Sequence, residues 1–416
     1  MKKNAKIILT CFPVFFILLT SSCNRQKDAI PLNVIPVAST AGNYSILNLS
    51  DYATEIKYIP LETNDLSLIG LIVQCAYEDQ KILIRDNTNS SYLFDDTGKF
   101  CRKIGQFGQG PDDYLSIISS WIHDNSIYMQ DQFKILIYNF NGYLIENNKL
   151  PLDEIPAQYT RNGWLHTILL KKNTYVMNVA SYEGTYPKAM LFETFQPESK
   201  VIKEYPSYFT LDKLSPGVLG VELGIMYRYK DDVRLWKITN DTVFTIGQDT
   251  EMKDAFIFEF GKHRATQSYI ERKEGESTVI AGLKYIIPSN IFESLDHLFI
   301  KFKFGNQAPE AIERTNRQGG QYIIDDVYGV FDKRTGELTL MYQPIKEKFG
   351  FNNDIDGGPV IWPEYISSND ELVSYIQPEE FMEYYNKIQN PSAELKEIAD
   401  KLEIDDNPIV IVAKLK

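Results

Sequence analysis

The feature that most constrains the fold of this chain is an internal repeat. The strand-like segment Ile82–Asp86 recurs 45 residues later as Ile127–Asp131, and the turn Phe94–Gly98 recurs 44 residues later as Tyr138–Gly142. A weaker copy of the same turn lies at 331–337. A unit of strand, Asp, strand, Gly-containing turn and strand with a period of about 40–50 residues is typical of one blade of a β-propeller.

The length of the chain is compatible with a ring of such blades. Six blades at this period need roughly 270 residues, so a chain of 416 residues would carry long insertions in several of them. Aromatic residues make up 13% of the chain, mostly Tyr and Phe, and these side chains favour strands because they pack well on a pleated surface. The repeats alone leave a β-sandwich or an irregular β-solenoid as alternatives, because both also have short strands and Gly turns.

The N-terminus has the pattern of an export signal. Three lysines precede an apolar run at 7–19, which is shorter than the roughly 20 residues that span a bilayer. Small residues then lead into Cys23, which resembles the lipobox of bacterial lipoproteins, although Thr20 stands where that pattern prefers Leu. We therefore expect a signal peptide at 1–22, acylation of Cys23 and a lipid-anchored tether at 23–43, followed by one folded domain at 44–416. The alternative is an ordinary cleaved signal with an incidental cysteine.

The charge of the chain limits its possible partners, and its cysteine content limits its possible cross-links. The formal charge of −13 has no basic cluster to offset it, which argues against nucleic acid as the main partner. After Cys11 and Cys23 are assigned to the leader and the anchor, only Cys75 and Cys101 remain, and two thiols do not make a disulfide framework. We expect both to be small buried residues, with a single bridge between them as the alternative.

The C-terminal region predicts two short helices and a closing strand. Pro378 followed by two glutamates is typical of a first helical turn, and we expect Asn390-Pro391 to cap a second helix with one apolar face. The strand after Asn407-Pro408 ends the chain. A propeller closes its ring by pairing its last and first strands, so we expect 409–415 to pair with 44–49 or 55–61.

Four stretches resemble the six-bladed β-propeller lipoproteins of gut Gram-negative bacteria, a family related to NHL-repeat propellers. They are 49–63, 92–111, 240–262 and 351–363, and they follow one another in the expected order. One departure is Asp112-Asp113-Tyr114, where the family has Gly-Glu-Tyr. The resemblance implies a six-bladed propeller with insertions, a short C-terminal helical segment and a ring-closing strand. It implies no chemistry, because the function of most of that family is unknown.

One candidate ligand site lies where second hairpins and links between blades meet. Asp86, Asp131, Gln109 and Asp113 all fall in such loops, which share one face of a propeller and surround its channel. The functional hypothesis is a polar ligand mouth on this face. The competing interpretation is structural, because an Asp at the start of a loop commonly accepts hydrogen bonds from the backbone of that loop.

The best metal candidate is the run from Asn352 to Gly357. Asn352, Asp354 and Asp356 stand at the first, third and fifth positions of a calcium-loop pattern, so calcium is the cofactor that this run would bind. Pro363 occupies the position that needs a bidentate Glu, and the alternative is a tight turn whose side chains accept backbone hydrogen bonds.

No catalytic motif is apparent in the sequence. None of the four histidines lies beside a nucleophile elbow, and we interpret His123 as a surface or loop residue. Trp164, Trp236 and Trp362 could stack on sugars, but packing in the core is the default for such large side chains.

We therefore predict a non-catalytic propeller, anchored in the outer membrane by its lipid, that binds a glycan, a peptide or a partner membrane protein. Whether it faces the periplasm or the cell surface stays open. The alternative is a calcium-dependent propeller hydrolase or lyase that acts on a glycan or a related extracytoplasmic substrate.

Overall fold

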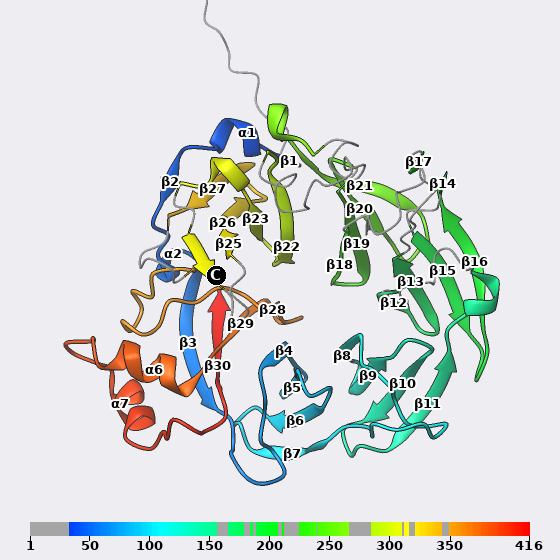
Figure 1. The fold of residues 1–416 in the computed structure, drawn as a ribbon, viewed down its shortest axis with the longest axis horizontal. Helices are drawn as coiled ribbons and strands as arrows, with labels where there is room; N and C mark the ends of the chain where they lie inside the picture. Colours follow the sequence, from blue (N-terminus) through cyan, green and yellow to red (C-terminus); the bar gives the residue numbers. More distant parts are fainter. Residues whose placement is uncertain are drawn as a thin grey trace, which may run out of the picture. The chain divides into compact units, whose positions relative to one another are not determined.

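The computed structural model is a six-bladed β-propeller, and Figure 1 shows its sheets following one another around a ring. It describes residues 33–155, 165–178, 184–185, 189–206, 210–211, 224–238, 240–265, 284–309, 312–315, 321–342 and 349–416. Each blade has four antiparallel strands, ordered from an inner strand at the centre of the ring to an outer strand at its rim. The six-bladed propeller expected from the repeats and the family resemblance together is confirmed.

The blades are numbered here in chain order. Blade one contains β4 (Ile72–Glu78), β5 (Lys81–Asp86), β6 (Ser91–Asp95) and β7 (Phe100–Lys103). Blade two contains β8 (Ser119–His123), β9 (Ser126–Gln130), β10 (Lys134–Asn139) and β11 (Leu144–Lys149). Blade three contains β12 (Thr167–Lys171), β13 (Thr174–Asn178), β15 (Ala189–Thr194) and β16 (Ser199–Tyr205).

The other three blades receive strands from the N-terminal segment. Blade four contains β18 (Gly224–Tyr229), β19 (Asp232–Lys237), β20 (Thr242–Ile246) and β21 (Met252–Phe258), with β1 (Val34–Ile35) added outside. Blade five contains β22 (Ile287–Glu293), β23 (His297–Lys303), β26 (Asp326–Asp332) and β27 (Glu337–Met341), with β2 (Tyr44–Ser45) added outside. Blade six contains β28 (Tyr365–Ile366), β29 (Glu371–Ile376), β30 (Ile409–Leu415) and β3 (Ala53–Pro60).

The remaining elements are short. Two small two-stranded sheets pair β14 (Gly184–Thr185) with β17 (Thr210–Leu211) and β24 (Ile312–Thr315) with β25 (Gln321–Ile324). Within the described ranges, the helical elements are α1 (Val37–Thr40), α2 (Leu49–Tyr52), α6 (Pro378–Tyr385), α7 (Ala393–Ala399) and the 3-10 turns at 152–154, 261–263 and 305–307.

The two faces of the ring differ in the length of their connections. On the turn face, which carries the first and third hairpins of each blade, the loops are short. Asp79-Gln80 and Asp124-Asn125 form two-residue turns in which both residues have positive φ, the conformation that matches strand twist in a hairpin. The link face carries the second hairpins and the links between blades. The long insertions lie in these connections, including the segment with α6 and α7 between β29 and β30.

The N-terminal segment forms a belt along the rim. β1 pairs in parallel with β21, β2 pairs in parallel with β27, and β3 then becomes the outer strand of blade six (Figure 1). β30 lies between β29 and β3, with Tyr58 opposite Ile411, so the ring closes through the second of the two expected segments, near 55–61.

The belt also shows that the fold includes residues that we expected to form a tether. Ile35 and Val37 are fully buried against blades four and five. The described part of the expected tether, residues 33–43, therefore packs on the rim, because these two apolar side chains leave water there.

The outer strands share a repeated irregularity. In blades one to four, the ladder between the third and fourth strands shifts by one residue, which leaves Cys101, Ile145, Ile202 and Ala255 without a partner opposite. Such bulges bend an edge strand and increase its twist, which discourages edge-to-edge pairing. This repeat becomes visible only when the strands are placed side by side.

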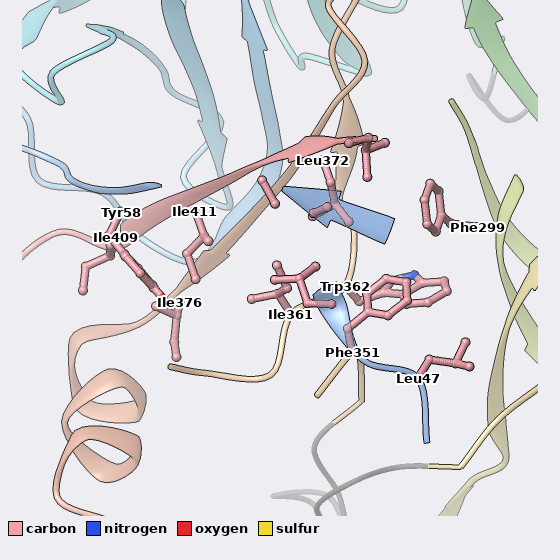
Figure 2. Close-up of a cluster of buried hydrophobic side chains, with 14 of the residues drawn as sticks. Leu47, Tyr58, Phe299, Phe351, Ile361, Trp362, Leu372, Ile376, Ile409 and Ile411 are labelled. Carbon is pink, nitrogen blue, oxygen red and sulfur yellow. The ribbon is translucent and has the colours of Figure 1, made fainter. Parts of the chain in front are cut away.

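Apolar layers between neighbouring blades form the core. Figure 2 shows the cluster between blades five and six, where Trp362 stacks on Tyr328 at 4.6 Å and on Phe351 at 5.4 Å between ring centroids. Trp236 is buried too, so both residues pack in the core as expected, whereas Trp164 lies outside the described residues.

The cysteines and the C-terminal helices match their expectations in part. Cys75 is buried as expected, whereas Cys101 is only half-buried, and neither forms a disulfide. Both C-terminal helices are present, but the cap of α7 is not the expected Asn390-Pro391. Its N-cap is Ser392, whose hydroxyl accepts a hydrogen bond from the amide of Leu395. Among the described residues, no helix is long and apolar enough to cross a membrane.

Candidate functional site

The carboxylate of Asp86, which we expected at a ligand-binding mouth, is hydrogen-bonded to the backbone of neighbouring loops. Asp86 ends β5 and is 1% exposed, and its side chain accepts hydrogen bonds from the amides of Gly70, Thr88 and Ser90 at 3.0–3.1 Å. Burial alone would raise the pKa of this carboxyl, but these bonds together lower it. The charge of Asp86 therefore orders the second hairpin of blade one.

Asp131 plays the same part in blade two. It is also 1% exposed and accepts hydrogen bonds from the amides of Phe133 at 2.7 Å and Lys134 at 2.9 Å. Asp113 is half-buried and accepts a bond from the amide of Gly110 at 2.9 Å, while Gln109 is exposed. The four residues do lie in link-face loops, but a ligand would have to compete with backbone donors for three of them.

The expected calcium loop is tied to the belt. Asn352 donates to the side chain of Asn48 at 2.8 Å, and Asp354 accepts from the amide and hydroxyl of Ser50 at 2.9 and 2.6 Å. Asp356 accepts from the hydroxyl of Tyr58 at 3.2 Å. These three side chains thus fasten the loop to the segment that closes the ring. Among the described residues, no group of three acidic, histidine or cysteine side chains could hold a metal ion.

The same link-face loops carry six large apolar side chains that are exposed. Leu66, Leu68 and Leu71 precede β4, Phe107 and Leu115 lie in the link between blades one and two, and Phe133 lies in the second hairpin of blade two. Their exposed fractions are 69%, 56%, 67%, 67%, 42% and 50%, respectively. These six residues are called the apolar arc below.

Hydrogen bonds connect the loops that carry the arc. Asn87 accepts from the amide of Leu71 at 3.0 Å, and Asn89, two residues further along the same hairpin, donates to the carbonyl of Leu115 at 3.4 Å. The amide of Leu115 in turn donates to Asp131 at 3.4 Å, beside Phe133. The buried Asp residues therefore hold the loops that present the arc.

The surroundings of the arc are acidic. Asp65 and Asp112 are exposed beside it, and Asp113 is half-buried. Of the nearby cations, Lys134 donates to the carbonyl of Pro111 at 2.6 Å, and Lys103 lies 4.9 Å from the centre of the Tyr92 ring. The arc is thus an apolar surface with a negative rim on a chain with a formal charge of −13.

A second polar cluster lies at the turn-face end of the channel, and the sequence analysis did not identify it. Glu78 at the end of β4 accepts from the hydroxyl of Tyr365 at 2.8 Å and from the amide of Ser368 at 2.6 Å, which links blade one to blade six. Burial raises its pKa, although these bonds oppose the effect. Because Glu78 is only 8% exposed and its carboxylate is already hydrogen-bonded, its role is to connect blade one to blade six.

His123 belongs to this cluster and is not the surface or loop residue that we expected. It ends the inner strand β8 and is half-buried, and its pKa is lowered by burial and by the positive charge of Arg228 on β18. Arg228 donates to the carbonyl of Leu169 at 2.6 Å and so links blades four and three. Polar side chains from blades one, two, four and six meet here because the inner strands all end at the same place, which sequence spacing does not show.

The fold and these loops define a class of protein: a six-bladed propeller with short turns on one face, decorated loops on the other and an N-terminal belt on the rim. The chain belongs to the family described as Domain of unknown function (DUF4934), whose model matches residues 32–414. A search of the curated proteins gives no match.

Two solved structures have a similar fold. One is described as a "putative exported protein" from Bacteroides fragilis; it is 18% identical, with a TM-score of 0.66, over 92% of this chain and 99% of that chain. The other is a member of the DUF4221 family from Bacteroides vulgatus, 13% identical with a TM-score of 0.50, over 88% of this chain and 97% of that chain. At this identity the likeness establishes the fold alone.

Proposed function

We propose that this protein is an exported, lipid-anchored and non-catalytic propeller that binds a partner protein through the apolar arc. The arc itself is the observation that carries the proposal. Monomeric proteins rarely keep a run of large apolar side chains on one surface unless something covers it. Here six such side chains gather on three neighbouring loops, and buried carboxylates hold two of those loops in place.

The chemistry of the arc favours a protein over a glycan or a lipid surface. Its aromatic residues are two phenylalanines, which lack the polar groups that bind sugar hydroxyls. The acidic rim would be repelled by anionic lipid headgroups. The partner that fits is a protein with an apolar patch surrounded by lysine and arginine, since such a charge pattern speeds encounter and fixes orientation.

The proposed cellular location rests on the N-terminal sequence pattern. The positively charged start, the apolar run and Cys23 after small residues support export and acylation, and the described fold begins only about ten residues after that cysteine. The Bacteroides fragilis protein of similar fold is described as a "putative exported protein", which agrees with this location. Replacing Cys23 with Ser should abolish incorporation of a labelled fatty acid and release the protein from membranes. Unchanged labelling would exclude Cys23 as the anchor and leave the arc untouched.

The partner can be tested in the native cells with a photo-crosslinking amino acid at position 107. We expect one discrete adduct, which should disappear when Phe133→Glu or Leu71→Glu is added to the same chain. The matched control places the same crosslinker at Leu295, which is 51% exposed on the turn face and should give no such adduct. An adduct at twice the mass of the chain would indicate self-association, and equal adducts at 107 and 295 would refute the arc as the docking surface.

A further inference from the structure

A groove on the rim between blades two and three has a single charged residue in its lining. The groove has a volume of about 360 Å³ and is lined by Leu144–Asn147 of β11 and by Gln196 and Pro197 of the third hairpin of blade three. This volume is at the lower end of the range of ligand sites. Among the described residues that line it, only Glu146 carries a charge.

Glu146 occupies a position that recurs from blade to blade. It is the first paired residue after the bulge in the outer strand of blade two. Counted from the same bulge, the equivalent residues are Arg102 in blade one, Lys203 in blade three and Phe256 in blade four. The side chain at this position lies toward the next blade, as Phe256 shows by packing against Phe331 of blade five. The other blades therefore indicate what the space beside Glu146 can hold.

Blades one and three carry a cation at this position. Arg102 donates a hydrogen bond to the carbonyl of Asn141, in the third hairpin of blade two. Lys203 donates at 2.7 Å to the carbonyl of Thr250, in the third hairpin of blade four, and at 2.8 Å to the carboxylate of Glu251 beside it. In both places a positively charged side chain thus connects an outer strand to the third hairpin of the next blade.

Between blades two and three the corresponding place has an anion and no cation. Glu146 is half-buried, and its Oε2 accepts a hydrogen bond from the side-chain amide of Asn148 at 3.0 Å. Its Oε1 accepts no hydrogen bond within the described part of the chain, and no described cation forms an ion pair with it. The nearest cation in the sequence, Lys149, is paired with Glu198 at 2.8 Å. Because a half-buried charge is stabilised by an opposite charge, this carboxylate is suited to a cation from outside the chain.

The surface around the groove indicates what kind of cation it fits. Tyr143, Ile145 and Phe195 lie in or beside the lining segments and are 71%, 52% and 58% exposed, respectively. Lysine and arginine side chains combine a charged end with an aliphatic stem that packs on apolar surfaces, and their charged ends also interact favourably with aromatic rings. A basic side chain on a polypeptide therefore uses both the carboxylate and the apolar border, whereas a bare metal ion uses the carboxylate alone.

We propose that this groove binds a lysine or arginine side chain of a partner protein, whose charged end pairs with Glu146. The bound side chain takes the place that Arg102 and Lys203 take between the neighbouring blades. Residues next to it in the partner pack on Ile145 and Phe195. Charge complementarity of this kind fixes the orientation of a partner more than it adds affinity. The groove shares no residue with the arc, so this inference does not depend on the function proposed for the arc.

The test uses the full chain and two fluorescent pentapeptides that place either arginine or citrulline between two isoleucines. Citrulline has nearly the shape of arginine but no charge. We expect saturable binding of the arginine peptide in fluorescence anisotropy at concentrations up to about 10 mM, and a Kd about ten-fold higher for the citrulline peptide. Glu146→Gln should raise the Kd of the arginine peptide to that of the citrulline peptide. The matched control Glu337→Gln, at an exposed glutamate in the outer strand of blade five, should leave both Kd values unchanged.

A second variant tests the comparison between blades. Glu146→Arg should place its own guanidinium against the hairpin of blade three, as Arg102 does against that of blade two, so it should abolish peptide binding without lowering Tm. A lower Tm for this variant would contradict the equivalence of the two positions.

The comparison of the two peptides on the wild type keeps the test decisive even if a variant folds poorly. Equal Kd values for the arginine and citrulline peptides, an unchanged preference for arginine in Glu146→Gln, or no saturable binding would each overturn the proposal. A photo-crosslinker on the arginine peptide should label residues within 143–147 or 195–197, and labelling confined to other segments would overturn it as well.

Discussion

The carboxylate of Glu293 should be among the most sensitive groups for stability. It is fully buried between blades four and five and accepts hydrogen bonds from Arg234 at 3.0 and 3.2 Å, Lys333 at 3.1 Å and the hydroxyl of Tyr227 at 3.0 Å. The side chains of Arg234 and Lys333 are only 11% and 15% exposed. One anion therefore balances two cations that have little access to water.

The Glu293→Gln substitution keeps the shape and removes the charge. Breaking a buried ion pair on one side costs about 3–5 kcal/mol, because the remaining charge stays buried. The amide oxygen of Gln still accepts one hydrogen bond, so we expect the free energy of unfolding to fall by about 3 kcal/mol. Unfolding entropy of about 2.1 cal/mol/K per residue over about 385 residues then converts this loss into a fall in Tm of about 4 °C.

The assay is thermal unfolding by calorimetry, with Glu251→Gln as the matched control. Glu251 forms an ion pair with Lys203 at 2.8 Å, but the side chain of Glu251 is 62% exposed. The Tm of the Glu251→Gln variant should therefore change by about 1 °C or less. Adding Lys333→Met to Glu293→Gln should recover part of the loss, because it removes one of the two unbalanced cations. Equal changes for Glu293→Gln and Glu251→Gln would refute the reasoning.

Three other predictions concern loops and closure. The lowered pKa of Asp86 means that its contribution to stability is present above the pKa of an unfolded aspartate, about 4, and is lost as the pH falls through the folded value. Asp86→Asn should thus lower Tm at neutral pH and flatten the fall of Tm in acid; an unchanged slope would contradict this. Gly98→Ala should destabilise more than Gly42→Ala in urea unfolding, because both have positive φ but only at Gly98 would a Cβ overlap the carbonyl of Pro60. Deleting 409–416 should abolish cooperative unfolding, since it removes the strand between β29 and β3; a sharp calorimetric transition in the shortened chain would show that the ring does not need it.

The fold could be predicted from the sequence because it depends on local patterns that repeat. The strand Ile82–Asp86 and its copy at 127–131 became β5 and β9, the second strands of neighbouring blades. The turns ending at Gly98 and Gly142 became third hairpins, as their positive φ requires. Alternation, turn residues and a constant period are properties of a linear chain, and they are sufficient to define a blade.

The role of individual polar residues was predicted only as a pair of alternatives. Asp86 and Asp131 were placed correctly at the link face, but the sequence could not say whether their carboxylates point to a ligand or to their own loops. The outcome depends on which backbone amides lie within 3 Å once the hairpin closes. The same holds for Asp354, whose partner Ser50 is 304 residues away.

The sequence by itself thus determined the blade, the order of the blades and the pattern of an exported leader. The tertiary structure decided everything that depends on contact between distant segments. Leu71, Leu115 and Phe133 are unremarkable loop residues until hydrogen bonds between three loops place those loops side by side. The physical reason is that burial, charge balance and unpaired strand edges are properties of surfaces in contact, and a repeat in the chain does not specify which surfaces remain uncovered.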